Sequence, residues 1–209
     1  ESSGSPPPLS EAGIRRILSD ERMLTLVTQP IVDLRRGVIV GYEILSRFAF
    51  DGTVPPDLVF ACATRCGLGV ELDALVVKRA LTLAGEKPPN CFVSINVDPL
   101  HLTSPLLMEV ILEHGDLGGI VFELTEQRQI HDLEEVSRCC YQLRKQGAFI
   151  AVDDAGAGYS GLKQILALRP QFLKLDRTLV SGVQGDEAKR AFDAGDRLRS
   201  WSGKASTAT

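Results

Sequence analysis

Short apolar runs of strand length recur along this chain and are separated by amphipathic stretches. The runs lie at 24–33, 38–47, 91–97, 120–124, 148–153 and 171–176. Apolar residues at helical spacing predict helices at 10–21, 57–66, 70–84, 105–114, 132–145 and 160–168. The first two runs, joined by a tight polar turn, predict an antiparallel hairpin, and the later alternation of helix and strand predicts parallel strands. The predicted fold class is α/β, with helices outside a barrel or an open sheet.

The two ends of the chain differ from this regular part. Residues 1–8 are rich in Ser and Pro, with neither an initiator Met nor an apolar signal core, and they predict a linker with an additional domain upstream. Residues 181–209 predict one helix, 186–201, and a disordered polar tail without a further strand. A closed barrel of this type has eight strands, so its last two strands are expected to be missing here.

Polar residues stand at or near the ends of the apolar runs. They are Gln29, Glu43, Asn96, Glu123, the pair Asp153 and Asp154, and Lys174. Strands this apolar are usually buried on both faces, where a carboxylate is costly unless it is paired or binds a metal. The carboxyl ends of barrel strands are also where active sites are built. Four acids, two amides and a lysine at such positions predict an active site rather than satisfied core polar groups.

These residue types suit the hydrolysis of a phosphodiester by two metal ions. Two divalent cations roughly 3.5–4 Å apart can activate a water and neutralise the phosphoryl and leaving oxygens. Mg²⁺ and Mn²⁺ prefer oxygen ligands. Of the adjacent Asp153 and Asp154, one can bridge both ions if the chain bends, and Gly156 and Gly158 allow such a bend. Lys174 can orient the water or stabilise charge.

Composition excludes several other classes of function. The net charge of −4 is unlike that of a nucleic-acid-binding protein, and no apolar run approaches the roughly 20 residues of a membrane span. The five cysteines are odd in number and form no C-x-x-C pair, which predicts a reducing cytoplasm and no disulfide framework. Cys62 and Cys66 are interpreted as small buried apolar residues rather than a metal site. His101, His114 and His131 show no ligand spacing and are given no role.

Six segments follow one another in a characteristic order. They are Gln29-Pro30-Ile31-Val32, Tyr42-Glu43-Ile44-Leu45-Ser46-Arg47, Ser94-Ile95-Asn96, Phe122-Glu123-Leu124-Thr125-Glu126, Asp153-Asp154-Ala155-Gly156-Ala157-Gly158-Tyr159-Ser160 and Leu173-Lys174-Leu175-Asp176. In this order they resemble the EAL domain of bacterial cyclic-di-GMP phosphodiesterases. The resemblance implies a TIM-like (β/α) barrel over residues 9–180 and hydrolysis of cyclic-di-GMP to pGpG.

The resemblance also implies a role for each polar residue. The first metal, Mg²⁺ or Mn²⁺, would be bound by Glu43, Asn96, Glu123 and Asp153. The second ion would be bound by Asp153 and Asp154, and Lys174 would contact the catalytic water. In this family the catalytic residues would accordingly be Glu43, Asp153 and Lys174.

Three further residues are assigned by the same resemblance. Arg47 would hold a phosphate of cyclic-di-GMP, and Gln29 would lie near the ligand. Glu126 would brace the loop after the Asp pair, which in this family couples ligand, metal and dimer contacts. A homodimer is therefore one of the assemblies that the resemblance allows.

The chain departs from the family pattern at two places. Ala155 and Ala157 replace a Phe and a Thr of the loop, and no counterpart of the family's later metal-binding glutamate follows residue 180. We therefore expect little or no hydrolysis by residues 1–209. One alternative is a catalytically inactive module that binds cyclic-di-GMP or a protein partner. Another is an excerpt of a longer enzyme.

Overall fold

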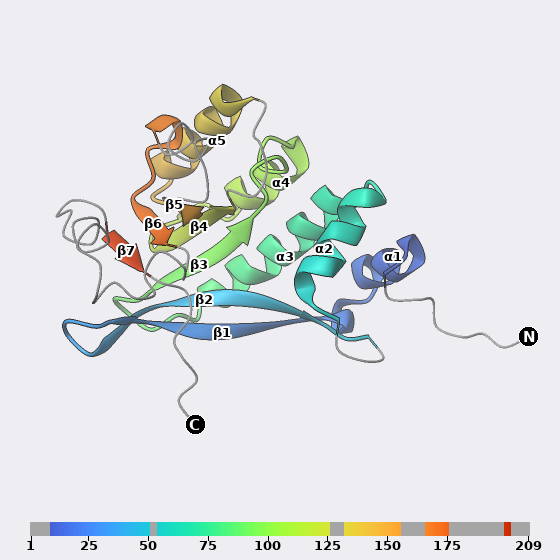
Figure 1. Ribbon diagram of the computed structural model, residues 1–209, viewed down its shortest axis with the longest axis horizontal. Helices are drawn as coiled ribbons and strands as arrows, with labels where there is room; N and C mark the ends of the chain where they lie inside the picture. Colours follow the sequence, from blue (N-terminus) through green and yellow to red (C-terminus); the bar gives the residue numbers. More distant parts are fainter. Residues whose placement is uncertain (1–8, 51–53, 126–131, 156–165, 176–198, 202–209) are drawn as a thin grey trace, which may run out of the picture.

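The structure is a computed structural model that describes residues 9–50, 54–125, 132–155, 166–175 and 199–201. One curved sheet runs through these residues. For 154, 155, 175 and 199–201 the structure describes the backbone alone. The sheet contains, in chain order, β1 (Leu24–Asp33), β2 (Val38–Phe48), β3 (Phe92–Val97), β4 (Ile120–Thr125), β5 (Phe149–Ala155), β6 (Phe172–Leu175) and β7 (Arg199–Trp201). The long β1–β2 hairpin is antiparallel and all later pairs are parallel (Figure 1). The predicted hairpin and parallel α/β order are confirmed.

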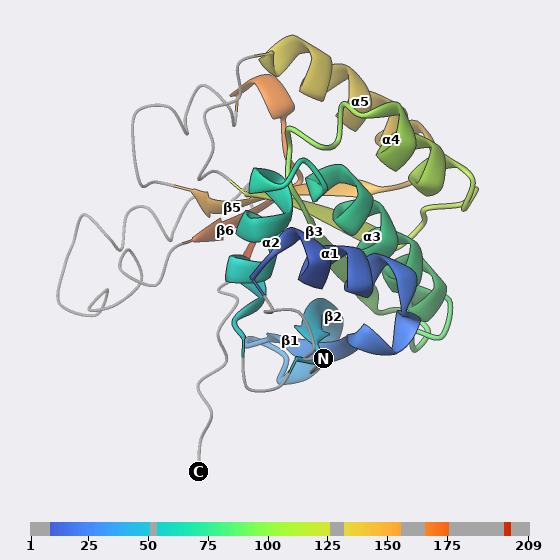
Figure 2. The same cartoon turned by 90° about the vertical axis from the view of Figure 1, so that its right-hand side faces the viewer.

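Helices cover one side of this sheet. They are α1 (Glu11–Ser19), the short 3₁₀ helix η1 (Glu21–Met23), α2 (Pro56–Arg65), α3 (Gly69–Ala84), α4 (Pro105–Leu112) and α5 (Leu133–Lys145). Side chains cap two of these helices, because Ser10 Oγ accepts a hydrogen bond from Gly13 N and Asp132 Oδ1 accepts one from Glu135 N. Figure 2 shows α1, α3, α4 and α5 following one another around the outside of the strands. No helix among the described residues is long and apolar enough to cross a membrane.

The segment after β6 corrects one prediction. Residues 199–201 were predicted to end a helix, and no strand was expected beyond 176. The structure instead places Arg199–Trp201 as β7, parallel to β6, with Lys174 paired to Trp201. A three-residue strand without an apolar run gives no periodic signal, because its pairing depends on the neighbouring strand. The predicted linker, most of the helix at 160–168, the rest of that at 186–201 and the polar tail lie outside the described residues.

Side chains alternate between the two faces of the strands. The face toward the helices is apolar, and its buried residues include Ile44, Ile95, Phe122, Val152 and Leu173, packed with α3, α4 and α5. Successive side chains of a strand point to opposite faces. The neighbours of these residues in the sequence therefore face away from the helices. They are Glu43, Asn96, Glu123, Asp153 and Lys174. The strands are thus apolar on one face and polar on the other at these positions, and Glu43, Glu123 and Lys174 are buried on the polar face.

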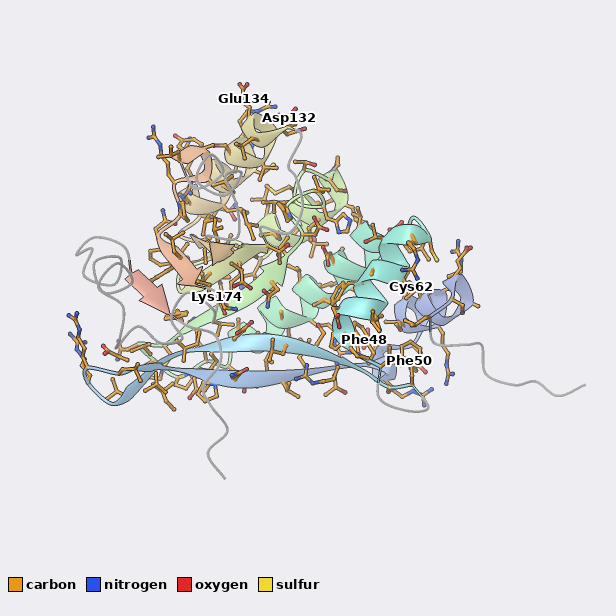
Figure 3. The ribbon with its side chains drawn as sticks, in the orientation of Figure 1. Phe48, Phe50, Cys62, Asp132, Glu134 and Lys174 are labelled. Carbon is orange, nitrogen blue, oxygen red and sulfur yellow. The ribbon has the colours of Figure 1, made fainter. Side chains whose placement is uncertain are left out.

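A second apolar cluster lies at the amino-terminal end of the domain. It joins α1, α2 and the start of α3 to the outer ends of the hairpin, where Phe48 packs edge-on against Phe60. Cys62 is buried in this cluster, near Phe48 and Phe50 in Figure 3. All five cysteines are free thiols, and Cys62 and Cys140 are fully buried. The interpretation of Cys62 as a small core residue is confirmed, whereas Cys66 is only half-buried.

Three phenylalanines form an aromatic cluster at the amino ends of the parallel strands. Phe92, Phe149 and Phe172 are the first residues of β3, β5 and β6. The rings of Phe92 and Phe172 stack with centroids 5.8 Å apart, and Phe149 meets Phe172 edge-on at 5.9 Å. Gly41 makes room for this cluster, since a Cβ atom there would lie 2.7 Å from the Phe92 ring. Phe172 lies two residues before Lys174, so the aromatic cluster shares the face that carries the polar residues.

Candidate active site

Five polar side chains meet on the face of the sheet that points away from the helices. This polar cluster consists of Glu43 on β2, Asn96 on β3, Glu123 on β4, Asp153 on β5 and Lys174 on β6. The strand register brings them together, because Asn96 is paired with Glu123 and Asp153 with Thr125. The sequence prediction that these residues converge at one end of the sheet agrees with this geometry.

Lys174 is the centre of the polar cluster. Its Nζ atom donates hydrogen bonds to Glu123 Oε2 at 2.7 Å and to Glu43 Oε1 at 3.1 Å. Asp153 Oδ2 lies 3.5 Å from the same nitrogen. Asn96 Nδ2 donates a further hydrogen bond to Glu43 Oε1 at 3.0 Å. Figure 3 shows Lys174 between β6 and β2, where the curved sheet brings these strands toward each other.

Burial sets the electrostatics of the polar cluster. Glu123 is completely buried, and this burial raises the pKa of its carboxyl to about 7, with the nearby Lys174 opposing the shift and Glu43 adding to it. Burial alone would lower the pKa of Lys174, but the carboxylates of Glu123, Glu43 and Asp153 outweigh it and the pKa is raised. Lys174 is therefore an ammonium at neutral pH. Three carboxylates around one ammonium leave an excess of negative charge when all are ionised.

Two buried oxygens, one in the polar cluster and one next to it, lack a hydrogen-bond partner among the described residues. They are Glu123 Oε1 and Ser94 Oγ. The Ser94 hydroxyl lies close enough to Glu123 to favour the charged carboxyl, although the contact falls short of hydrogen-bond geometry. Ser94 was given no role from the sequence, yet it is fully buried and paired in register with Glu43. Its signal was its place two residues before Asn96, which puts it on the same face.

The chemistry of the polar cluster fits a hard divalent cation. All its potential ligands are carboxylate or amide oxygens, the type that Mg²⁺ and Mn²⁺ prefer. The unpartnered Oε1 of Glu123 and the excess negative charge both favour a cation. Among the described residues no three Asp, Glu, His or Cys side chains stand ready to hold an ion. The three carboxylates instead surround the ammonium of Lys174.

The remaining predicted site residues lie in different surroundings. Gln29 on β1 is paired directly with Glu43, so it is next to the polar cluster. Arg47, four residues after Glu43 on β2, is exposed, and its Nη1 donates a hydrogen bond to the carbonyl oxygen of Ser46 at 2.7 Å. The side chain of Asp154 and the whole of Glu126 lie outside the described residues.

A buried Asp–His pair supports the loop that follows Asn96. His101 Nδ1 lies 2.8 Å from Asp73 Oδ2, and the backbone N of Asp98 donates a long hydrogen bond to the same oxygen at 3.4 Å. Burial raises the pKa of Asp73, with His101 opposing the shift. His101 has no role that its spacing in the sequence could reveal, because its partner lies on α3. The pair fixes the loop beside the polar cluster to that helix.

The chain matches the model of a known protein family along most of its length. The EAL domain model matches residues 12–195. The chain belongs to the EAL domain family. This match extends past residue 180, the predicted end of the EAL-type domain. EAL domains have a TIM-like barrel fold, and the helices outside a curved, mainly parallel sheet agree with that fold.

Known proteins agree with this assignment. The probable cyclic di-GMP phosphodiesterase PdeG of Escherichia coli (strain K12) is 28% identical over 192 residues, which cover 86% of this chain and 38% of the relative. The chain thus spans less than half the length of this relative. The EAL domain of Xanthomonas citri FimX, solved with c-diGMP, has a TM-score of 0.73 and 20% identity over 85% of this chain and 73% of that one. Klebsiella pneumoniae BlrP1, solved as a calcium/cy-diGMP complex, has a TM-score of 0.67 and 28% identity over 81% of this chain and 44% of that one.

Proposed function

We propose that the polar cluster is the metal-binding part of a cyclic-di-GMP phosphodiesterase site. The observation that carries this proposal is the meeting of Glu43, Asn96, Glu123 and Asp153 around Lys174 on one face of the sheet. These are the residue types and strand positions that the family resemblance requires. The name of PdeG and the ligand of BlrP1 support cyclic-di-GMP as the substrate.

The chain's own residues have distinct tasks in this proposal. The first cation, Mg²⁺ or Mn²⁺, is held by oxygens of Glu43, Asn96, Glu123 and Asp153. When bound, divalent cations make a water nucleophilic and neutralise charge on the phosphoryl oxygens. The buried strands keep Glu43 and Glu123 fixed, so little reorganisation is needed as charge develops. Asn96 orients Glu43 through its amide hydrogen bond.

Lys174, Arg47 and Gln29 act on the substrate side of the site. The Lys174 ammonium stabilises negative charge and orients the attacking water. Arg47 is exposed at the end of β2, and its guanidinium can hold a phosphate in a bidentate manner once it leaves the Ser46 carbonyl. Gln29, next to Glu43 in the register, contacts the ligand from β1.

A second candidate function is binding of cyclic-di-GMP without turnover. It is favoured by β7, the strand beside β6, because none of its residues Arg199–Trp201 is an acid. The second cation would then rely on Asp153 and Asp154, and the loop braced by Glu126 would carry Ala155 and Ala157 in place of larger residues. A site that holds the second ion weakly would slow hydrolysis, since two ions together stabilise the attacking and the leaving oxygens.

A single-turnover assay separates the two functions. The chain is mixed in excess over cyclic-di-GMP with Mn²⁺ or with EDTA, and pGpG is followed by chromatography. We expect slow formation of pGpG that requires Mn²⁺ and is lost in Glu43→Gln, with ligand binding weakened in Arg47→Ala. Binding of cyclic-di-GMP without any pGpG after long incubation would overturn hydrolysis in favour of a binding module. Failure to bind the ligand at all would overturn both.

A further inference from the structure

The ammonium of Lys174 occupies the space between the carboxylates that are proposed to hold the first cation. Its three neighbours, Glu123, Glu43 and Asp153, come from three different strands. The Lys174 side chain is only 8% exposed, and those of Glu43 and Glu123 are 7% and 0% exposed. Water therefore contributes little to the solvation of these charges.

Such an arrangement favours a cation. Carboxylates buried close together repel one another and lose their hydration, so they stay ionised together only when a positive charge lies close to them. A lysine ammonium has three N–H donors and no acceptor. Those donors face three carboxylates here, two at hydrogen-bond distance and the third at 3.5 Å. Lys174 thus neutralises part of the negative charge of the polar cluster without an ion, while Glu123 Oε1 stays without a hydrogen-bond partner among the described residues.

A divalent cation at this site competes with the ammonium. Mg²⁺ takes oxygen ligands at about 2.0–2.1 Å, closer than any Lys174 contact, and would lie among the same carboxylate oxygens. Two positive charges at so short a distance repel strongly in a buried site. Among the described residues no group of three or more Asp, Glu, His or Cys side chains is placed to hold an ion.

We infer that Lys174 is an internal counter-ion that holds the carboxylates of Glu43, Glu123 and Asp153 together in the metal-free protein, and that a divalent cation binds by displacing it. This inference rests on the proposed function, because it takes these carboxylates as the metal ligands. Binding is then an exchange of one cation for another. The exchange lowers the affinity for metal, and it selects divalent ions, because a monovalent ion brings no more charge than the ammonium that it replaces.

The first test measures Mn²⁺ binding by titration calorimetry, without substrate. Wild type is compared with Lys174→Met, which keeps the length of the side chain but removes its charge, and with Lys174→Arg, which keeps the charge. Lys78→Met removes one exposed lysine charge from α3 as a control. We expect Lys174→Met to bind Mn²⁺ about tenfold or more tightly than wild type, because no like charge has to leave. Lys174→Arg and Lys78→Met should bind no more tightly than wild type.

Thermal unfolding provides a second readout. Lys174→Met should unfold at a lower temperature than wild type in EDTA and should gain more from Mn²⁺. If wild type binds Mn²⁺ and Lys174→Met binds it equally or less tightly, the claim that the cation displaces Lys174 is wrong, while the proposed metal site stands. If neither protein binds Mn²⁺, the proposed metal site itself is wrong, and the exchange with it.

A measurement on the wild type covers the case in which Lys174→Met does not fold. The buried, hydrogen-bonded ammonium should give a resolved ¹H–¹⁵N signal in protein labelled with ¹⁵N-lysine, assigned by its loss in Lys174→Arg. Saturating Mg²⁺ should shift this signal or remove it as the ammonium leaves the carboxylates. A signal that stays unchanged at saturation would show that Lys174 keeps its place beside the metal, and would overturn the inference.

Discussion

The aromatic cluster and the polar cluster lie on the same face of the same strands, at opposite ends. At the amino ends, Phe92, Phe149 and Phe172 pack ring against ring. At or near the carboxyl ends, carboxylates from β2, β4 and β5 surround Lys174. The backbone is the same parallel ladder at both ends, so the difference lies in the side chains. One end contributes stability, and the other carries charges whose burial costs stability.

The energetics of the two clusters have opposite signs. Burying an aromatic ring is favourable, and a well-placed ring pair adds about 0.5–1.5 kcal/mol beyond its buried area. A buried ion pair, by contrast, often contributes nothing net, because losing hydration offsets the attraction. The polar cluster is therefore hard to explain as a stabilising feature. Its cost is accounted for if the charges serve to bind a cation.

The largest effect on stability is expected in the aromatic cluster. Phe172→Ala removes the ring that contacts both Phe92 and Phe149 and should lower the free energy of unfolding by about 3 kcal/mol. The loss should be the same with and without Mn²⁺, since the ring packs with Phe92 and Phe149 at the amino ends of the strands. Urea unfolding measures it, with the exposed Tyr141→Ala as the control for a lost aromatic ring. A loss confined to the Mn²⁺-bound protein would show that the two clusters are coupled.

The corresponding change in the polar cluster should affect metal rather than folding. Asp153→Asn removes a carboxylate from the proposed bridging position and should weaken Mn²⁺ binding by about 100-fold. Glu134→Gln removes one acid from the outer end of α5, far from Lys174 in Figure 3, and should leave the affinity unchanged. Calorimetric titration compares the three proteins. Equal Mn²⁺ affinity in a folded Asp153→Asn protein contradicts the ligand assignment.

The pH dependence of stability reports on the buried Glu123. Its folded-state pKa of about 7 lies above the ordinary value of 4.5, so the folded protein binds this proton more tightly than the unfolded chain does. The stabilisation is fully present below about pH 4.5 and is lost as pH rises through about 7. In EDTA, the free energy of unfolding should be about 2 kcal/mol lower at pH 8 than at pH 5 through this group. Urea unfolding of Glu123→Gln should lack this difference between pH 5 and pH 8. If the free energy of unfolding depends on pH in the same way in both proteins, the raised pKa does not belong to Glu123.

A small effect is expected where the backbone approaches the aromatic cluster. Gly41→Ala places a Cβ atom about 2.7 Å from the Phe92 ring, which has to shift. The free energy of unfolding should fall by about 1 kcal/mol. Gly37→Ala at the hairpin turn is not a suitable control, because Gly37 has a positive φ of 66° and an alanine there would strain the backbone. The suitable comparison is Gly41→Ala combined with Phe92→Leu, which should recover part of the loss if the ring causes it.

Much of the fold could be predicted because the strands and helices carry strong local signals. The predicted bounds 24–33 match β1, and the predicted helix 132–145 matches α5, which Asp132 caps. β7 was missed because its three residues have no pattern of their own. The expectation that the apolar runs are buried on both faces agrees with the structure at Glu43 and Lys174, which are buried although they alternate with core residues such as Ile44 and Leu173.

The candidate site was predictable as a set of residues but not as a network. The strand ends indicated which side chains would meet, because parallel strands align their carboxyl ends. Which carboxylates Lys174 contacts, and that Ser94 lies beside Glu123, depends on side-chain positions that no spacing encodes. The same holds for Asp73 and His101, which lie on separate elements and meet only after folding.

The most direct test of the account is a crystal structure of the protein soaked with Mn²⁺, with anomalous scattering used to locate the ion. We expect an anomalous peak bounded by oxygens of Glu43, Asn96, Glu123 and Asp153, with Lys174 Nζ moved away from the carboxylates that it contacts in the metal-free protein. Absence of a peak at saturating Mn²⁺, or a peak elsewhere with Lys174 still bonded to Glu43 and Glu123, would contradict the claim that the polar cluster is a metal site.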